Sequence, residues 1–540
     1  MNFFYFLCKR IITIYSFIFA ILIAMNSLII TIDYDYNEFN WKWSTSKSIQ
    51  VILSIFLFLV LILFFRKWLD ISSKKISNKI LLRYTFFLSL ALGIGWVISA
   101  DALQQWDQGD ILNLSRIKTQ LDIGNVGGYD HAGYIERYPY QAPFIYLFRL
   151  LILISGTRAD YIYSLLNALF VAITMRSLVA LTIEYDKNNH KTPIIAFILS
   201  ISLLPSYFFT TFIYPNTLSI MLISIAFLYF MKWYKTGNNT QIIKYGIYSS
   251  IAIGAAVAFK SSSIVGLISF IVVNILIIIK EKKIIPIAFI LISIATNWII
   301  LNGSMYHLSK ISNANLNNGV PKIIWIAMGI GANQPSDKPI VLDFPGGMYD
   351  GLPWTLSPEE YSPDNLKKLA YKLIEKRVMR FKDQPKETLY FFVKKCSYEW
   401  GDPLYGAILS SNWQRGNVFT LSEQKVIDLS QGDRPITPVA HSIYYGQLNS
   451  FIKWLSDINQ SLIFIGFLLG VILISHKNYS DRWLEFMPPI LYSLVGSLVY
   501  IFWESKSQYI FGFVTLLIPI ASYGFQNINL SNFLEKKNKL

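Results

Sequence analysis

Apolar runs long enough to cross a lipid bilayer recur along almost the whole chain. A membrane-spanning helix needs about 20 mostly apolar residues, and hydrophobic residues fill 53% of the 540 positions. The runs lack the strict alternation of outer-membrane strands, which favours helices over a barrel. The sequence therefore predicts an all-α polytopic membrane protein with about twelve (11–13) transmembrane helices, near residues 11–32, 49–65, 84–100, 161–183, 193–209, 214–231, 245–259, 263–279, 284–302, 453–475, 485–502 and 508–525.

Basic residues gather in the connections that twelve spans would place on one face. By the positive-inside rule that face is cytoplasmic, and both termini lie there. The net charge of +15 fits this topology and contacts with anionic membrane lipids, and not nucleic-acid binding. Abundant Ile, Asn and Lys indicate a bacterial source and a plasma membrane. The clusters are Lys9 with Arg10, 66–83, Lys187 with Lys191, 232–244, 280–283, Lys477 with Arg482, and 536–539.

The same pattern divides the chain into five parts. We expect a large loop and a small mixed domain on the extracytoplasmic face, where function is to be sought. Within the loop, 141–156 reads as a short re-entrant or interfacial helix. The parts are N-terminal transmembrane helices (1–100), the first extracytoplasmic loop (101–160), a transmembrane core (161–302), an extracytoplasmic domain (303–450), and C-terminal transmembrane helices with a cytoplasmic tail (451–540).

The extracytoplasmic domain contains a basic, helical-looking stretch, SPEEYSPDNLKKLAYKLIEKRVMRFKDQ. Ser357 followed three residues later by Glu360 matches a capping box, which predicts the start of that helix. Turn-rich DFPGGMYDGLPW precedes the stretch. We therefore expect a partly folded domain rather than a linker.

Residues that hold metals or cofactors show no recognisable spacing. Cys8 and Cys396 are far apart and predicted on opposite sides, so no disulfide framework is expected. The five histidines form no HxxH or HExxH pattern. Asp107 and Asp110 could take a divalent cation, but two acids three apart do not define a site. With no P-loop or dinucleotide fingerprint either, the sequence predicts no cofactor and no metal.

Three charged residues stand at the ends of apolar runs. Asp101 directly follows LSLALGIGWVISA, Lys260 separates two runs, and Glu504 lies between the last two. A charge within the bilayer costs at least about 2.5–3.5 kcal/mol, so each residue needs a partner or a function. Structural explanations also exist: an interfacial helix end for Asp101, snorkelling for Lys260, and an ion pair with Lys506 for Glu504.

An acid at the outer end of an early helix, the element YIERYPYQ, and a Glu followed by Gln-Tyr before the final span occur together here. This combination resembles the GT-C superfamily of polyprenyl-phosphate-sugar-dependent glycosyltransferases, in particular bacterial relatives of protein O-mannosyltransferases and aminoarabinose transferases. The resemblance implies a GT-C-like fold, a polyprenyl-phosphate sugar donor and a cell-envelope acceptor, which is a glycan, glycolipid or protein. Single displacement would invert the sugar's configuration.

The resemblance also implies roles for particular residues. It makes Asp101 the catalytic base, with Asp107 as the fallback, and it gives the donor phosphate to Arg137 and Lys260. Substrate contacts would come from Glu136, Tyr138, Gln141, Glu504 and Tyr509. Other readings stay open: an envelope polysaccharide polymerase or ligase that relies on arginines, a flippase or transporter, and a scaffold or sensor. Substitution Asp101→Asn separates an enzyme from a scaffold.

Overall fold

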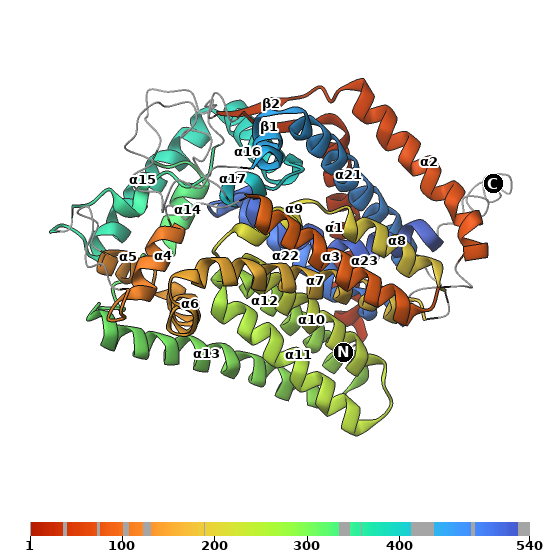
Figure 1. The fold of residues 1–540 in the computed structure, drawn as a ribbon, viewed down its shortest axis with the longest axis horizontal. Helices are drawn as coiled ribbons and strands as arrows, with labels where there is room; N and C mark the ends of the chain where they lie inside the picture. Colours follow the sequence, from red (N-terminus) through yellow and green to blue (C-terminus); the bar gives the residue numbers. More distant parts are fainter. Residues whose placement is uncertain are drawn as a thin grey trace.

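Every apolar run of the sequence is helical in the structure (Figure 1). The computed structural model describes residues 2–35, 40–72, 76–100, 107–121, 131–187, 189–333, 346–357, 359–411, 437–476 and 481–527. Its longer helices are α1 (Asn2–Ile29), α2 (Ile49–Ser72), α3 (Asn78–Ala100), α7 (Ala159–Tyr185), α10 (Asn216–Lys235), α11 (Asn239–Phe259), α12 (Ile264–Glu281), α13 (Ile285–Ser312), α15 (Pro363–Asp383), α16 (Pro385–Gly401), α21 (Gln447–Ser475), α22 (Trp483–Phe502) and α23 (Ser507–Asn527).

Shorter elements connect these helices. Two strands, β1 (Thr31–Asp35) and β2 (Asn40–Ser44), form an antiparallel hairpin between α1 and α2. The other short elements are α4 (Asp107–Arg116), α5 (His131–Arg137), α6 (Ala142–Ser155), α8 (Lys191–Ile201), α9 (Pro205–Phe208), α14 (Ile323–Gly329), α17 (Ala407–Ser411), α20 (Pro438–Tyr445), and the 3-10 turns at Pro139–Gln141, Gly156–Arg158, Phe209–Thr211, Ser261–Ser263 and Leu352–Trp354.

Ten helices in the described part of the chain are long and apolar enough to cross a membrane, and an eleventh span results if α8 and α9 count together. The axis bends by 50° between Lys191–Ile201 and Pro205–Thr211. Pro205 causes the break because it has no N–H to bond the carbonyl of Ile201 four residues earlier. The remaining predicted span, 49–65, lies within α2, a helix of 24 residues.

The last helix, α23, lies at the centre of the bundle. In its most apolar window 89% of residues are buried, against 17% for α13, which runs along the outer edge (Figure 1). Helix α23 packs closely on α21 because small residues face each other, as is common between membrane helices. A Cβ added at Gly524 would lie only 2.2 Å from the carbonyl oxygen of Gly466, and Gly470 borders the same contact.

Two of the basic clusters predicted to share one face, those of Lys9 and Lys235, both contact the start of α22. The ammonium of Lys9 in α1 lies 5.8 Å from the ring centroid of Trp483 in α22. Lys235 at the end of α10 forms an ion pair of 3.1 Å with Glu485 in α22. This is the charge pattern of a cytoplasmic face, although the compartment itself stays a prediction.

The β1–β2 hairpin and α16 pack together at the opposite end. Tyr34 and Trp41 are directly paired across the strands, and Trp41 meets Tyr398 of α16 edge-on at 6.2 Å. The expected mixed character of 303–450 is thus located elsewhere: its described residues form helices and turns, while the strands belong to the connection between α1 and α2.

The basic helix within 303–450 begins later than the sequence predicts. Its first residue is Pro363, and the side chain of Ser362 accepts a hydrogen bond from the Asn365 N–H at 3.1 Å. The predicted capping box of Ser357 and Glu360 therefore does not start α15. Proline at the first helical position costs no hydrogen bond, which explains the later start.

Helix α6 forms most of the segment 141–156, which the sequence predicts to be a short re-entrant or interfacial helix. Its 14 residues extend about 21 Å at 1.5 Å per residue, less than the roughly 30 Å of hydrocarbon. It packs against α4, where the Ser115 hydroxyl donates to the Ile145 carbonyl at 3.1 Å and Arg149 donates to the carbonyl of Ile117. A single 3-10 turn joins α6 to α7, so the segment is a short helix anchored on both sides.

A buried lysine fixes the turn between α22 and α23. The ammonium of Lys395 donates hydrogen bonds to the carbonyls of Gly329 at 2.8 Å, Ile501 at 3.0 Å and Trp503 at 2.8 Å. Next to them, the Glu504 N–H donates to a carbonyl of α14 at 2.7 Å. The turn that contains Glu504 is therefore held by the segment 303–450 as much as by its own helices.

Candidate active site

A buried glutamine fixes the first turn of α4. The side-chain oxygen of Gln108 accepts a hydrogen bond from the Ile213 N–H at 2.8 Å, and its amide donates to the carbonyl of Ser410 at 3.2 Å. Gln108 is 3% exposed, and breaking hydrogen bonds at so buried a group is costly. The adjacent Asp107 therefore has a fixed place at the N-terminus of α4.

Asp107 is accessible to solvent and yet largely surrounded by protein. Burial raises the pKa of its carboxyl, while Lys506 and the hydroxyl of Tyr134 act in the opposite direction. Burial also raises the pKa of Asp110 to about 7, and the charge of Asp107 adds to that shift. The two acids thus belong to a group of residues, here called the recess, whose surroundings make negative charge unfavourable. A carboxylate with a raised pKa that a ligand can reach is suited to accept a proton.

Glu504 reaches the same recess from the turn between α22 and α23. It is 4% exposed, and its Oε1 has no hydrogen-bond partner. Burial raises the pKa of Glu504, Lys506 and the hydroxyl of Tyr509 lower it, and Asp107 raises it again. Because Lys506 acts on both Asp107 and Glu504, the three residues form one electrostatic group.

Lys506 is the cation of this group, and its sequence position predicts only an ion pair with Glu504. Its ammonium lies 5.8 Å from the ring centroid of Tyr349. Among the described residues it forms no ion pair within 4.0 Å. The predicted contact with Glu504 is thus replaced by a longer-range interaction. The available signal for Lys506 was its place two residues after a candidate acid.

Lys260 lies beside two tyrosine rings, at the turn between α11 and α12. Its ammonium donates a hydrogen bond to the side-chain oxygen of Asn216 and lies 5.7 Å from the ring centroid of Tyr214 and 5.8 Å from that of Tyr509. Burial lowers the pKa of Lys260 to about 7. In the described part of the chain no carboxylate pairs with it, so an anion that enters here would stabilise its charged form.

Tyr214 links Lys260 to the acids. Burial raises the pKa of its hydroxyl, and Asp107 is the next largest cause. The buried side chain of Gln141 donates a hydrogen bond to this hydroxyl. Gln141, a predicted substrate ligand, therefore positions Tyr214 at the edge of the recess. Tyr214 itself was missed because nothing in its local sequence distinguishes it from a core aromatic residue.

Arg137 lies in a neighbouring group of rings. Its guanidinium is stacked 4.1 Å from the ring centroid of Trp354 and 4.1 Å from that of Tyr361, and the residue is 8% exposed. These contacts join α5 to the segment 303–450. A role in holding the donor phosphate stays a prediction, and the contacts present here are structural.

Glu136 and Tyr138 belong to the same junction. A side-chain oxygen of Glu136 accepts a hydrogen bond from the Asn315 N–H at 2.7 Å. The hydroxyl of Tyr138 accepts from the indole N–H of Trp354 at 3.0 Å and lies 3.3 Å from the hydroxyl of Tyr349. Through Tyr349, which is also close to Lys506, the junction borders the recess.

The structure therefore brings several predicted residues together and separates others. Asp107, Glu504 and Tyr509 share the recess, Lys260 and Gln141 meet it through Tyr214, and Glu136, Arg137 and Tyr138 form the junction beside it. Asp101, the first candidate for the base, lies outside the described residues. Within the described ranges, no group of three or more His, Cys, Asp or Glu side chains is arranged to hold a metal ion.

No protein-family model matches the chain, and a search of curated proteins finds no match. Among solved structures, the chain is similar to the apo form of the oligosaccharyltransferase of Archaeoglobus fulgidus, with 13% sequence identity and a TM-score of 0.38. The superposition covers 86% of this chain and 52% of that protein, so the chain spans about half of that protein's length.

Proposed function

We propose that the chain is an integral membrane glycosyltransferase that moves a sugar from a polyprenyl-phosphate donor to a hydroxyl of a cell-envelope acceptor on the extracytoplasmic face. One observation supports this above all. Asp107, an accessible carboxylate, interacts electrostatically with Lys506, and Lys260 lies beside Tyr214. Neither lysine has an ion pair among the described residues. A base and unneutralised cations are what the transfer needs.

In the proposed reaction Asp107 accepts the proton of the acceptor hydroxyl while the acceptor oxygen bonds to the anomeric carbon of the sugar. The bond from that carbon to the phosphate oxygen breaks, and its electron pair stays with the phosphate. Polyprenyl phosphate therefore leaves with one more negative charge, which Lys260 and Lys506 offset. Because the two oxygens lie on opposite sides of the anomeric carbon, its configuration inverts.

The position of Lys260 suits a lipid-linked phosphate. It lies between the ends of two membrane-crossing segments, Asn239–Phe259 and Ser261–Glu281. A polyprenyl chain could lie along these apolar helices while its phosphate meets the ammonium at their ends. Since burial lowers the pKa of Lys260 to about 7, binding of a phosphate would be accompanied by proton uptake at neutral pH.

The test is sugar transfer in membranes that contain wild-type protein, Asp107→Asn, or the control Asp364→Asn. Asp364 also lies in the first turn of a helix, on the exposed side of α15. The donors are radiolabelled polyprenyl-phosphate sugars, and label is followed into wall polymer, glycolipid and protein. General-base loss should lower transfer about 10²–10⁴-fold in Asp107→Asn alone.

Two results would contradict the proposal. Equal transfer by wild type and Asp107→Asn would remove Asp107 as the base and return that role to Asp101. Transfer from lipid-diphosphate oligosaccharides but not from polyprenyl-phosphate sugars would instead support an envelope polysaccharide polymerase or ligase.

A further inference from the structure

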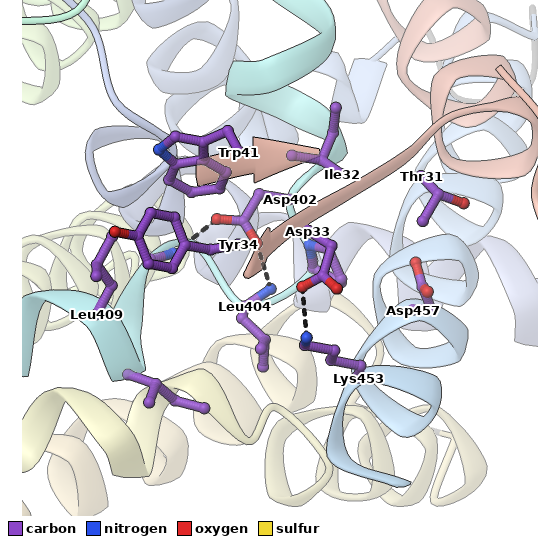
Figure 2. A pocket seen from close by; sticks show the side chains of 13 residues that line it. Thr31, Ile32, Asp33, Tyr34, Trp41, Asp402, Leu404, Leu409, Lys453 and Asp457 are labelled. Carbon is purple, nitrogen blue, oxygen red and sulfur yellow. Dashed lines mark hydrogen bonds and ion pairs between the residues drawn. The ribbon is translucent and has the colours of Figure 1, made fainter. Parts of the chain in front are cut away.

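A cavity lies between the β1–β2 hairpin and the loop that follows α16. Its volume is about 70 Å³, room for several water molecules. Figure 2 shows the rings of Tyr34 and Trp41 on one side of it and Asp33, Lys453 and Asp457 on the other. None of these residues belongs to the recess around Asp107.

The floor of this cavity is a rigid, preformed loop. One oxygen of the Asp402 carboxylate accepts from the Leu404 N–H at 2.9 Å, and the other accepts from the Gly406 N–H and the Ser507 hydroxyl, both at 2.7 Å. Tyr405 has a positive φ of 52°, a strained backbone for a bulky residue that persists only where its surroundings enforce it. The carboxylate of Asp402 is therefore committed to the loop, and the ligand-facing polar groups must come from elsewhere.

Two ion pairs supply those groups. Lys453 and Asp33 are 2.5 Å apart, and both side chains are partly exposed. Lys47 and Asp457 are 2.6 Å apart, with Lys47 almost fully buried and Asp457 facing the cavity. An ammonium beside a carboxylate offers donors and acceptors together, which is the combination a hydroxyl group satisfies because it both donates and accepts.

A negative charge on a ligand would be unfavourable in this cavity, because it would meet the carboxylates of Asp33, Asp402 and Asp457. The ammonium of Lys453 is already paired with Asp33. A neutral ligand rich in hydroxyl groups avoids the repulsion and can use both members of that pair. The aromatic wall adds an apolar surface: the rings of Tyr34 and Trp41 are 5.3 Å apart in an edge-on arrangement, and such rings present flat faces to the C–H side of a sugar.

Trp41 also connects this cavity to the recess. It borders a second, water-sized cavity of about 10 Å³ that Lys506 lines as well, and Lys506 is the cation that acts on Asp107 and Glu504. A chain-like ligand seated against Trp41 could therefore extend toward Asp107.

We infer that the cavity lined by Tyr34, Trp41, Asp33 and Lys453 binds a neutral, hydroxyl-bearing sugar residue of the acceptor glycan, beside the residue whose hydroxyl reacts. As an acceptor subsite it rests on the proposed function. As a saccharide-binding site it can be tested without any transfer.

The first experiment measures binding by saturation-transfer NMR on the full chain in lipid nanodiscs, free of glycoside detergents. The probes are lactose, cellobiose and mannobiose, with methyl glucuronide and glucosamine as charged comparisons. Trp41→Leu and Asp33→Asn are compared with Trp43→Leu. Trp43 is a matched control because it lies on the same strand and packs on Tyr390 at 6.2 Å, outside the cavity.

We expect wild type and Trp43→Leu to transfer saturation to a neutral disaccharide. Trp41→Leu should lose this signal, and Asp33→Asn should give a weaker one. Absence of any neutral signal, equal signals in Asp33→Asn and wild type, or equal binding of methyl glucuronide would overturn the inference. If Trp41→Leu does not fold, Asp33→Asn decides, since it keeps the shape of the side chain.

A second measurement separates this inference from the proposed function. With the transferable donor present, Trp41→Leu should raise the KM for a saccharide acceptor about tenfold, an effect typical of a lost aromatic contact, and Trp43→Leu should leave it unchanged. Transfer by wild type without Trp41-dependent binding would refute the subsite alone. Trp41-dependent binding without transfer would refute the proposed function alone.

Discussion

Asp107 and Glu504 lie almost four hundred residues apart in the chain and face the same recess. Burial raises the pKa of Glu504, and the carboxylate of Asp107 raises it further. One lysine, Lys506, opposes this shift at both acids. With two carboxylates and one nearby cation, the recess favours retention of a proton by one acid of the pair. Proton transfer to Asp107 is therefore coupled to the charge on its neighbours.

The rate of transfer should fall in acid as Asp107 becomes protonated. Because burial raises the pKa of Asp107, this fall should occur at higher pH than the value near 4 of an ordinary aspartate. Lys506→Met removes the cation that lowers the pKa of Asp107 and should move the fall to higher pH. The pH profile of kcat/KM checks this, with Asp364→Asn as the control. A profile that Lys506→Met leaves in place would contradict the electrostatic coupling.

Stability should depend on Asp110. Burial raises the pKa of Asp110 from 3.8 to about 7, so between these values the folded protein binds more protons than the unfolded chain. The free energy of unfolding should therefore decrease as pH rises through this window and level off above it. Asp110→Asn should flatten that decrease. Thermal unfolding at about pH 5 and about pH 8 tests this, and a parallel decrease in both proteins would refute it.

Lys260→Met should weaken the donor complex. A hydrogen bond to a charged group contributes about 1.5–3 kcal/mol, so the KM for the donor should rise roughly ten- to a hundredfold. Lys260→Arg should retain part of the affinity because it keeps the charge. Lys310→Met is the matched control, since Lys310 also lies over a tyrosine ring, at 4.2 Å, but is exposed on α13. Similar KM values for both Met variants would exclude Lys260 from donor binding.

Arg137→Ala should destabilise the junction between α5 and the segment 303–450. Desolvated cation–π contacts contribute up to about 2 kcal/mol each, and Arg137 makes two. A double-mutant cycle with Trp354→Leu, measured by thermal unfolding, should show that the two residues together contribute more to the free energy of unfolding than they do separately. If Arg137→Ala instead raises the donor KM without loss of stability, the guanidinium contacts the donor phosphate as the family resemblance implies.

Gly524→Leu should prevent the close packing of α21 on α23. The first atom of the new side chain would already overlap the carbonyl of Gly466, so we expect a large loss of folded protein in size-exclusion chromatography. Gly303→Leu in α13 is the control, because a Cβ there meets nothing within 4 Å. Equal yields of both variants would show that α21 and α23 can separate at little cost.

The sequence predicts the helices well because each apolar run must satisfy its own backbone hydrogen bonds within the bilayer. Lys260 and Glu504 were recognisable for the same reason: a charge at the end of a span is costly enough to stand out. Tyr214 and Tyr349 were not recognisable, because their function depends on which distant residues fold against them. Arg137 was recognisable as a candidate, but its contacts were not, since the rings that enclose it lie more than two hundred residues further along the chain.

The three carbonyls held by Lys395 have a consequence for engineering and for evolution. They come from both the segment 303–450 and the hairpin of α22 and α23, so neither part can be exchanged alone without stranding a buried ammonium. A chimera that imports only the segment 303–450 from another protein should lose the conformation of the turn around Glu504. The segment and the turn are thereby inherited as a single unit.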